Sequence, residues 1–334
     1  MIKADANYLL AAFLNTLGVF NLRKAVIKIL IVIVVLAAGS GGLLLWQQHQ
    51  SPARQSTEKA APLVHKKTQI KKNVNLIALG DSLTQGVGDQ KKNGGYVGII
   101  KSKIEKNYNT TVHTSNYGVA GDRSDQILSR LKSEKNFQSK LKSADVIVMT
   151  VGGNDLMQSL QKNIFVANQS EFTRNMNQAN QKYVTKLTKL FKAVRHYNPQ
   201  APIFLFSVYN PFYVYFANVD TITASVNSWN QVTKEKMDNY GPSYFVDINN
   251  LMSHGQYTTK KAQQQLIKQD KQANTGATSQ KQAIKVMSEK NHNLNDYIST
   301  DDNFHPNHLG YIKMSDQLFK TMQHHISWIR EGNE

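Results

Sequence analysis

A serine in a glycine-rich turn is the first candidate for chemistry in this sequence. Ser82 lies in the segment from Ala78 to Asp89, directly after the apolar run Val74 to Leu79, which is typical of a buried strand. Reacting groups and ligands collect at the C-terminal ends of strands in a parallel sheet. A serine there can point its hydroxyl outward as a nucleophile and leave its own N–H free. Gly-Asp-Ser is also an ordinary turn sequence, so the rest of the chain has to decide between the two interpretations.

A histidine and an aspartate near the C-terminus could supply the base that such a serine needs. Asp302 lies three residues before His305, and in a tight turn its carboxylate can accept the Nδ1–H of the imidazole. This bond fixes the tautomer and leaves Nε2 free to take a proton from a serine hydroxyl. Asp301 and His308 are neighbouring alternatives for the two roles. Asp302, His305 and His308 could instead bind a metal ion, but no further obvious ligand set accompanies them.

Two loops contain groups that can stabilise a developing oxyanion. Gly121 follows the second predicted strand, where a glycine lets a backbone N–H point into the cleft. Asn154 follows the third predicted strand after two glycines, and its amide can donate a hydrogen bond to the same point. Loss of one such donor typically raises the barrier by about 2.7–4 kcal/mol. The ordinary alternative is that Asp122 or Asn154 caps a helix or a turn.

Alternating strand and helix patterns indicate the scaffold that positions these residues. Five short segments, most of them apolar, are strand candidates, and amphipathic segments between and after them predict helices. The predicted strands are 75–80, 111–117, 145–151, 203–208 and 244–248, and the predicted helices are 96–108, 124–132, 171–197, 222–240 and 308–330. We therefore expect an α/β fold in which helices cover both faces of a parallel sheet, because five strands are too few to close a barrel.

Two segments interrupt the alternation. Residues 155–170 are expected to form an irregular connection after the third strand. Residues 253–299 form a long polar insertion, rich in Gln and Lys, with some helix-forming content. Long insertions of this kind are either lids and binding loops or solvated helical excursions, and the sequence leaves both interpretations open.

The N-terminal segment predicts a membrane anchor. Residues 29–46 carry no charge and are just long enough to span a hydrocarbon core. The positive charges of Arg23 and Lys24 before them predict a cytoplasmic N-terminus. Residues 1–46 are therefore expected to be a cytoplasmic tail and a transmembrane signal anchor. Cleavage near Ala37 to Gly39, as in a signal peptide, is the alternative.

A polar segment separates this anchor from the predicted domain. Residues 47–72 are rich in Gln, Lys, Ser, Ala and Pro, which is typical of a disordered linker. Residues 73–334 are then the folded domain, which we expect to lie outside the cytoplasm at the cell membrane or, after cleavage, in a secreted form. No role is assigned to residues 1–22.

The composition narrows the classes of partner. The 334 residues are 40% hydrophobic, which suffices for one sizeable α/β domain with extensions. There is no cysteine, so neither a disulfide framework nor a cysteine-ligated metal site can form. The formal net charge of +17 favours anionic lipid or an anionic cell wall as a partner. Nucleic acid is not expected, because the lysines are dispersed and no binding motif accompanies them.

The four candidate stretches, in this order, resemble the sequence blocks of the GDSL family, or SGNH hydrolase superfamily. The matching residues are Gly80 to Leu83 with Ser82 as nucleophile, Gly121, Asn154 in Gly-Gly-Asn-Asp, and Asp302 with His305 in the last block. The resemblance covers about residues 73–328. The Gly-x-Ser-x-Gly elbow of α/β-hydrolases is absent, because Thr84 stands where its second glycine would be.

This resemblance implies a flavodoxin-like, three-layer α/β/α fold and the hydrolysis of esters or thioesters without a cofactor or a metal. It implies a catalytic triad of Ser82, His305 and Asp302. It also implies an oxyanion hole made by the N–H groups of Ser82 and Gly121 and by the side chain of Asn154. More narrowly, the chain is similar to membrane-anchored lipases or acylhydrolases of lysophospholipase-like type from Gram-positive bacteria.

The natural substrate is not determined by the sequence. The predicted tether and the positive charge favour the acyl esters of nearby phospholipids or lysophospholipids. They equally fit an O-acetyl group on a cell-wall polymer or polysaccharide, as an esterase or an acyltransferase would use. A third interpretation is a non-catalytic module that binds wall or lipid. The presence of every triad and oxyanion residue argues against this interpretation.

Overall fold

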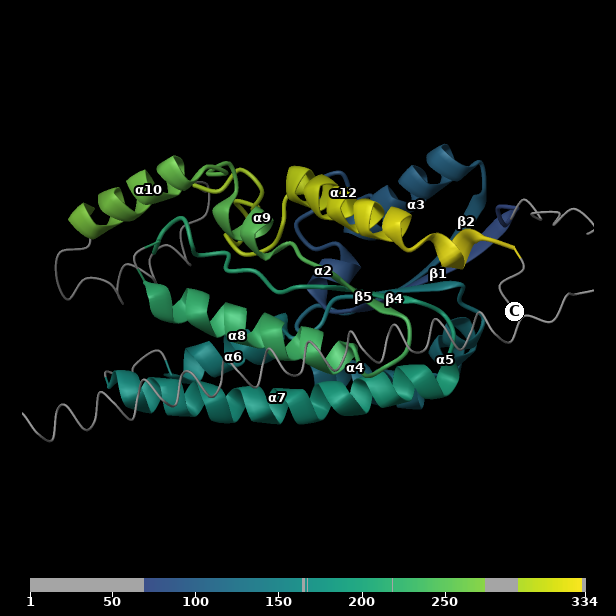
Figure 1. The fold of residues 1–334 in the computed structure, drawn as a ribbon, viewed down its shortest axis with the longest axis horizontal. Helices are drawn as coiled ribbons and strands as arrows, with labels where there is room; N and C mark the ends of the chain where they lie inside the picture. The colour runs from purple at the N-terminus through teal and green to yellow at the C-terminus, as the bar shows by residue number, and fades with distance from the viewer. Residues whose placement is uncertain (1–68, 164–165, 167, 218, 274–293, 332–334) are drawn as a thin grey trace, which may run out of the picture. The chain divides into compact units, whose positions relative to one another are not determined.

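Five parallel strands form one sheet in the described part of the chain (Figure 1). They are β1 (Asn73–Gly80), β2 (Thr111–Gly118), β3 (Val146–Met149), β4 (Ile203–Phe206) and β5 (Ser243–Val246). Their order across the sheet is β2-β1-β3-β4-β5, and each neighbouring pair is parallel. The predicted parallel sheet and its three-layer α/β/α architecture are confirmed, and each strand lies within two residues of its predicted position or is a shorter part of it.

The computed structural model describes residues 69–163, 166, 168–217, 219–273 and 294–331, all within the unit Lys67–Glu334. The predicted membrane anchor and most of the predicted linker lie outside these residues, as does the middle of the 253–299 insertion. No helix within the described ranges is long and apolar enough to cross a membrane.

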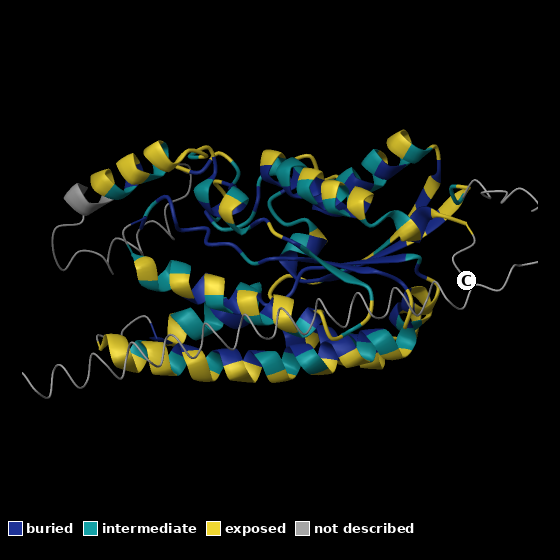
Figure 2. Cartoon of the chain, viewed as in Figure 1, coloured by how far each residue is buried: buried dark blue, intermediate teal, exposed yellow. Residues whose placement is uncertain are grey.

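Each strand divides its side chains between two hydrophobic cores, because successive residues of a strand point to opposite faces. In β1, Ile77 and Leu79 pack into one core, whereas Leu76 and Ala78 pack into the other. This arrangement explains why β1, β3 and β4 are almost continuously apolar in sequence, whereas the edge strand β2 is mostly polar. Figure 2 shows the result: the centre of the sheet is buried, and the surrounding helices are buried on one side and exposed on the other.

Helices cover both faces of the sheet (Figure 1). On one face lie α3 (Gly95–Tyr108), α12 (His308–His324) and the short 3-10 helix η1 (Ile326–Ile329). On the other lie α4 (Ser124–Ser133), α5 (Lys135–Lys142), α7 (Gln169–Tyr197) and α8 (Asp220–Met237). The predicted last helix, 308–330, is thus a helix up to His324 followed by a separate 3-10 turn.

The expectation of an irregular connection over 155–170 is wrong for most of that range. Helix α6 covers Gly153–Asn163, and α7 begins at Gln169, where the side chain of Asn168 caps it. The first turn of α6 contains two residues of poor helix propensity, Gly153 and Asn154, which obscure its start in the sequence. Burial of Leu156 compensates for them, since tertiary packing provides most helix stability in proteins.

The polar insertion is partly helical. It begins within α9 (Asn249–His254) and continues through α10 (Lys260–Ala273), and its end returns to the domain where Ile298 pairs with Pro306. At the other end of the domain, Ile70 pairs with Arg330. Residues 69–72, which the sequence assigns to the linker, therefore contact the C-terminal segment.

Candidate active site

Ser82 lies at the point where the strand order of the sheet reverses. The strand before it, β1, is flanked by β2 on one side and by β3 on the other. In open α/β sheets, ligands bind in the crevice outside the carboxyl ends of the strands at such a point. Ser82 is the first residue of the short helix α2 (Ser82–Gln85), so its N–H has no partner within that helix. The turn therefore presents both the hydroxyl and the N–H of one residue at the crevice.

The structure brings His305 and Asp302 to this serine. The Nε2 atom of His305 lies 2.8 Å from the Oγ atom of Ser82, although 223 residues separate them in the chain. On the other side of the ring, Nδ1 forms a hydrogen bond with Oδ2 of Asp302. An aspartate on Nδ1 makes that nitrogen the N–H donor and leaves Nε2 with a lone pair directed at the serine hydroxyl. The geometry is that of a nucleophile, a base and an orienting carboxylate.

The turn before His305 holds Asp302 in its charged form. Its Oδ1 atom accepts the N–H groups of Phe304 and His305, both at 2.9 Å. Burial by itself would raise the pKa of Asp302, but the hydrogen bonds from the His305 side chain and from these two N–H groups outweigh it and lower the pKa below its usual value. A carboxylate is therefore present on Nδ1 at neutral pH.

The alternative acid and base lie elsewhere. Asp301 is exposed, and His308 places its Nδ1 atom 2.8 Å from Oδ1 of the buried Asp89. His308 and His305 thus contact different carboxylates. Among the described residues, no group of three acidic or histidine side chains is arranged to hold a metal ion. Of the pairs that the sequence left open, Asp302 and His305 are the one in contact with Ser82.

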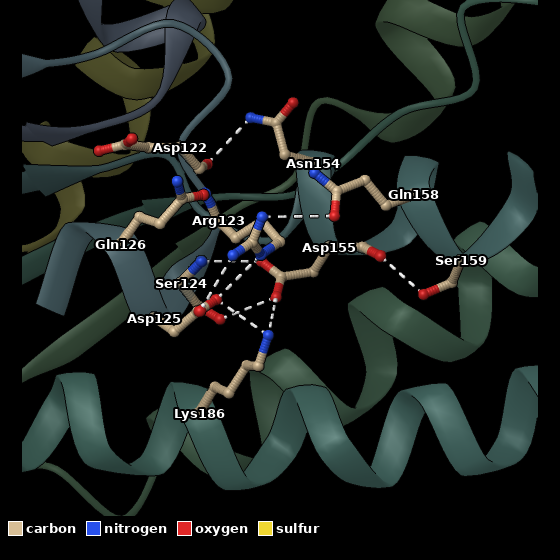
Figure 3. Close-up of polar contacts among 10 residues, drawn as sticks. All are labelled: Asp122, Arg123, Ser124, Asp125, Gln126, Asn154, Asp155, Gln158, Ser159 and Lys186. Carbon is tan, nitrogen blue, oxygen red and sulfur yellow. Dashed lines mark hydrogen bonds and ion pairs between the residues drawn. The ribbon is translucent and has the colours of Figure 1, made fainter. Parts of the chain in front are cut away.

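The two predicted oxyanion donors follow the two strands that flank β1, and Asn154 but not Gly121 lines the pocket beside Ser82. Gly121 has a φ of +85°, a conformation that favours glycine, and an added Cβ there would meet open space. Asn154 lies beside Ser82 in the wall of one pocket. Its Nδ2 atom donates to the carbonyl of Asp122 at 2.9 Å, which orients the amide (Figure 3). An amide nitrogen has two N–H groups, so the second remains able to donate to a ligand.

A buried polar network that the sequence did not predict lies beneath the serine turn. Oδ1 of Asp81 accepts the Thr150 hydroxyl at 2.8 Å and the N–H of Leu83 at 3.1 Å. Burial raises the pKa of Asp81, and these hydrogen bonds only partly oppose that effect. Thr150 approaches so closely that a Cβ on Gly80 would lie 2.3 Å from its hydroxyl. Gly80 and Asp81 therefore pack against Thr150, directly after β3. In the sequence, only the glycine indicates such a close approach.

An arginine whose role the sequence did not predict connects the ends of two strands. Arg130 of α4 donates to the carboxylate of Asp122 at 2.7 Å. It also donates to the carbonyls of Gly80 and Tyr117, at 3.2 and 3.1 Å. These are the ends of β1 and β2, so one guanidinium links the serine turn to the loop that carries Gly121. Nothing in the local sequence distinguishes Arg130 from an ordinary charged residue on an exposed helix.

A small apolar pocket of about 50 Å³ opens beside Ser82 and Asn154. Apolar side chains from α6, from the loop after β4, from α8 and from the turn before His305 form most of its wall. These are Leu156, Met157, Leu160, Val208, Phe212, Ile222, Val226 and Phe304. Such a lining suits a hydrocarbon group better than a sugar, because sugar hydroxyls would lose their hydrogen bonds to water. Beyond its high content of aromatic residues, nothing in the sequence indicates that the segment after β4 lines a pocket.

Comparison with known proteins places this geometry in a family. Residues 78–312 match the GDSL-like Lipase/Acylhydrolase family, a range that includes every predicted site residue. An uncharacterized protein, YpmR of Bacillus subtilis, is 28% identical over 257 residues, which are 77% of this chain and 84% of YpmR. The spore germination lipase LipC of Bacillus licheniformis is 33% identical over 135 residues, 40% of this chain and 63% of LipC.

A solved structure shares the fold. The lipase Lip_vut3 from a goat rumen metagenome aligns with a TM-score of 0.53 and 22% sequence identity, over 74% of this chain and 97% of that one. The family match confirms the resemblance drawn from the four sequence blocks, and this structural likeness confirms the fold.

Proposed function

The chain belongs to the GDSL-like lipase/acylhydrolase family, and we propose that it hydrolyses carboxylic esters through Ser82, His305 and Asp302. One observation carries the proposal: the Nε2 atom of His305 lies 2.8 Å from the serine Oγ, while its Nδ1 atom is bonded to Asp302. A serine hydroxyl is a weak nucleophile unless such a base takes its proton. No cofactor or metal takes part in the proposed reaction.

The reaction proceeds in two halves. In the first, Oγ of Ser82 attacks the acyl carbonyl as Nε2 of His305 takes its proton, and Asp302 stabilises the resulting imidazolium. The imidazolium then protonates the leaving alcohol as the ester C–O bond breaks, which leaves an acyl-serine. In the second half, water attacks the acyl carbon, His305 takes its proton, and that proton returns to Oγ as the acid leaves.

The negative charge of each tetrahedral intermediate falls on the former carbonyl oxygen. The N–H groups of Ser82 and Gly121 and the free N–H of the Asn154 amide are the proposed donors to this oxygen. Their backbones are fixed at the ends of three adjacent strands, β1, β2 and β3. Preorganised donors of this kind need little reorganisation as charge develops, which is why they lower the barrier.

The apolar pocket is the proposed site for the acyl group. Its lining favours a hydrocarbon chain, and its volume of about 50 Å³ favours a short one. By the same measure, a water molecule needs roughly 10–15 Å³. A long-chain lipid ester would need a longer acyl site than this pocket provides, whereas the acetyl group of a wall polymer needs only a small one. Turnover of p-nitrophenyl esters from acetate to palmitate separates them: a maximum at acetate favours the O-acetyl esterase or acyltransferase, and a rise to palmitate favours the lipase.

Replacement of Ser82 by alanine tests the mechanism. We expect hydrolysis of p-nitrophenyl butyrate to be abolished and labelling by a fluorophosphonate probe to be lost, with an unchanged melting temperature. Ser102→Ala, at an exposed serine of α3, is the control and should keep both activities. Undiminished turnover in a folded Ser82→Ala variant would refute the mechanism. A wild-type protein that neither labels nor turns over any ester would instead favour the non-catalytic binding module.

The proposed site of action is the outer side of the cell membrane, where a single N-terminal span anchors the domain, or from which the domain is secreted after cleavage. The apolar segment 29–46 and its positive flank support this location. The absence of cysteine makes a clean test possible, because Ser102→Cys introduces the one thiol in the chain. A membrane-impermeant maleimide should label this variant in intact cells. Labelling only after lysis would contradict the proposal.

A further inference from the structure

The two donors outside the serine turn are attached to strands that are not neighbours. Gly121 follows β2 and Asn154 follows β3, and β1 lies between these strands. The ladder hydrogen bonds of the sheet therefore connect the two loops only through β1. An oxyanion hole needs its donors at 2.7–3.1 Å from one oxygen position, so the distance between the loops has to be fixed by other contacts.

Asp155 makes such a contact. Its Oδ2 atom accepts the backbone N–H of Ser124 at 2.8 Å, and its Oδ1 atom accepts the Ser124 hydroxyl at 3.0 Å (Figure 3). Both residues are buried. Ser124 is the first residue of α4, so its N–H is one of the donors that a helix leaves unpaired at its start. The carboxylate on α6 therefore caps α4 across the space between them.

Two consecutive residues of α6 hold the loop on either side of Arg123. Asn154 donates to the carbonyl of Asp122, and Asp155 accepts from Ser124. Lys186 of α7 adds an ion pair, with its Nζ atom 3.6 Å from Asp155. Asp155 does not contribute to the apolar pocket, because the residues of α6 that do so are on the helix face around Leu156 and Leu160. Its carboxylate thus contacts Ser124 at the end of the loop and Lys186 of α7, and not the wall of the pocket.

We propose that Asp155 is a positioning residue that sets the distance between the Gly121 and Asn154 oxyanion donors. The role rests on the proposed ester hydrolysis. Without the carboxylate, the N–H of Ser124 loses its partner in a buried place and the loop is released from α6 at that point. One donor is then displaced rather than removed, so the loss should be smaller than the 10²–10³-fold typical of a deleted donor. We expect kcat to fall about 10- to 50-fold, with KM changed less than about threefold.

Asp155→Ala tests the proposal, and Asp155→Asn is the conservative rescue. An asparagine can accept from the Ser124 N–H and donate to its hydroxyl, so kcat should return to within about threefold of the wild type. Ser124→Pro releases the loop from the opposite side, since proline has no N–H and is well tolerated at the first position of a helix. It should lower kcat as Asp155→Ala does, and it decides the question if Asp155→Ala does not fold.

Asp145→Ala is the matched control for a purely structural effect. Asp145 also accepts a backbone N–H, that of Asn75 at 2.7 Å, and pairs with Lys71. It directly precedes β3, at the N-terminal end of the strands, whereas the site lies at their C-terminal ends. Its loss should lower the melting temperature without changing kcat.

A boronic acid inhibitor provides the decisive second measurement, because its serine adduct places an oxygen among the oxyanion donors. Inhibitor affinity should fall in parallel with kcat in Asp155→Ala and Ser124→Pro. The proposal is overturned if both variants keep kcat within threefold of the wild type, or if kcat falls with unchanged inhibitor affinity. A parallel kcat loss in Asp145→Ala would also overturn it. Failure of the ester hydrolysis itself is recognised separately, by turnover that survives Ser82→Ala.

Discussion

Replacement of Asp302 by asparagine exchanges one carboxylate oxygen for an NH₂ group. It should leave His305 almost unable to act as the base for Ser82. In the wild type, Oδ1 of Asp302 is occupied by two backbone N–H groups and Oδ2 is bonded to Nδ1 of His305. The oxygen of an asparagine would therefore stay with the backbone and leave its NH₂ group facing Nδ1. Because NH₂ only donates, Nδ1 would have to accept, and the ring proton would move to Nε2. That proton points at Ser82, so the imidazole could no longer take the proton of the serine.

The opposite orientation of the asparagine is also unfavourable. It would place the NH₂ group against the N–H groups of Phe304 and His305 and leave two backbone donors without an acceptor, at about 1–3 kcal/mol each. The wrong tautomer is therefore the cheaper outcome. A misplaced tautomer of this kind lowers kcat by about 10³- to 10⁴-fold. This corresponds to about 4–5.5 kcal/mol in the activation free energy.

The assay is steady-state hydrolysis of p-nitrophenyl butyrate, with melting temperatures measured in parallel. Asp301→Asn is the matched control, because Asp301 is the exposed neighbour that the sequence allowed as an alternative partner of His305. It should keep kcat within about twofold of the wild type. A kcat for Asp302→Asn within tenfold of the wild type would refute the tautomer reasoning. A large loss in Asp301→Asn would refute the choice of carboxylate.

Three further predictions concern the surroundings of the serine. Asn154→Ala should lower kcat by about 10²–10³-fold in the same assay, and a loss below threefold would exclude it as an oxyanion donor. Leu160→Trp should fill part of the apolar pocket and raise the kcat/KM ratio of acetate to hexanoate ester at least several-fold, whereas Gln161→Trp, exposed on the same helix, should leave it unchanged. Burial raises the pKa of Asp81, so ionisation of this carboxyl destabilises the folded state as pH rises above about 4. The free energy of unfolding, measured in urea, should therefore rise for Asp81→Asn relative to the wild type between pH 4 and pH 8. A difference between the two proteins that does not depend on pH would contradict a raised pKa of Asp81.

The sequence predicted the strands better than the connections after them. Strands β1, β3 and β4 are largely apolar because both faces of the sheet are covered there, and hydropathy alone predicts their positions, whereas the edge strand β2 is mostly polar. Helix α6 was missed because Gly153 and Asn154 open it, and what stabilises it is the packing of Leu156 against other elements. The same polar start gives α6 the two residues, Asn154 and Asp155, that contact the loop before α4.

Contacts between residues close in the chain were accessible from the sequence. The Asp302–His305 pair lies within one turn, and Ser82 follows directly on an apolar strand, so local geometry suffices to propose each of them. The polar bonds of Asp81 to Thr150, of Arg130 to the strand ends and of Asp155 to Ser124 join residues 13 to 69 positions apart, and their residue types carry no local signal.

The amino-acid sequence by itself determined the alternation of strands and helices, the polar turns at the strand ends and the family to which these turns belong. Only the tertiary structure decided that β1 lies between β2 and β3, and that His305 meets Ser82 across 223 positions of the chain. It also decided the size and lining of the apolar pocket beside Ser82. The physical reason is that hydropathy and turn chemistry act over a few residues, whereas strand order and pocket shape depend on how all layers pack together.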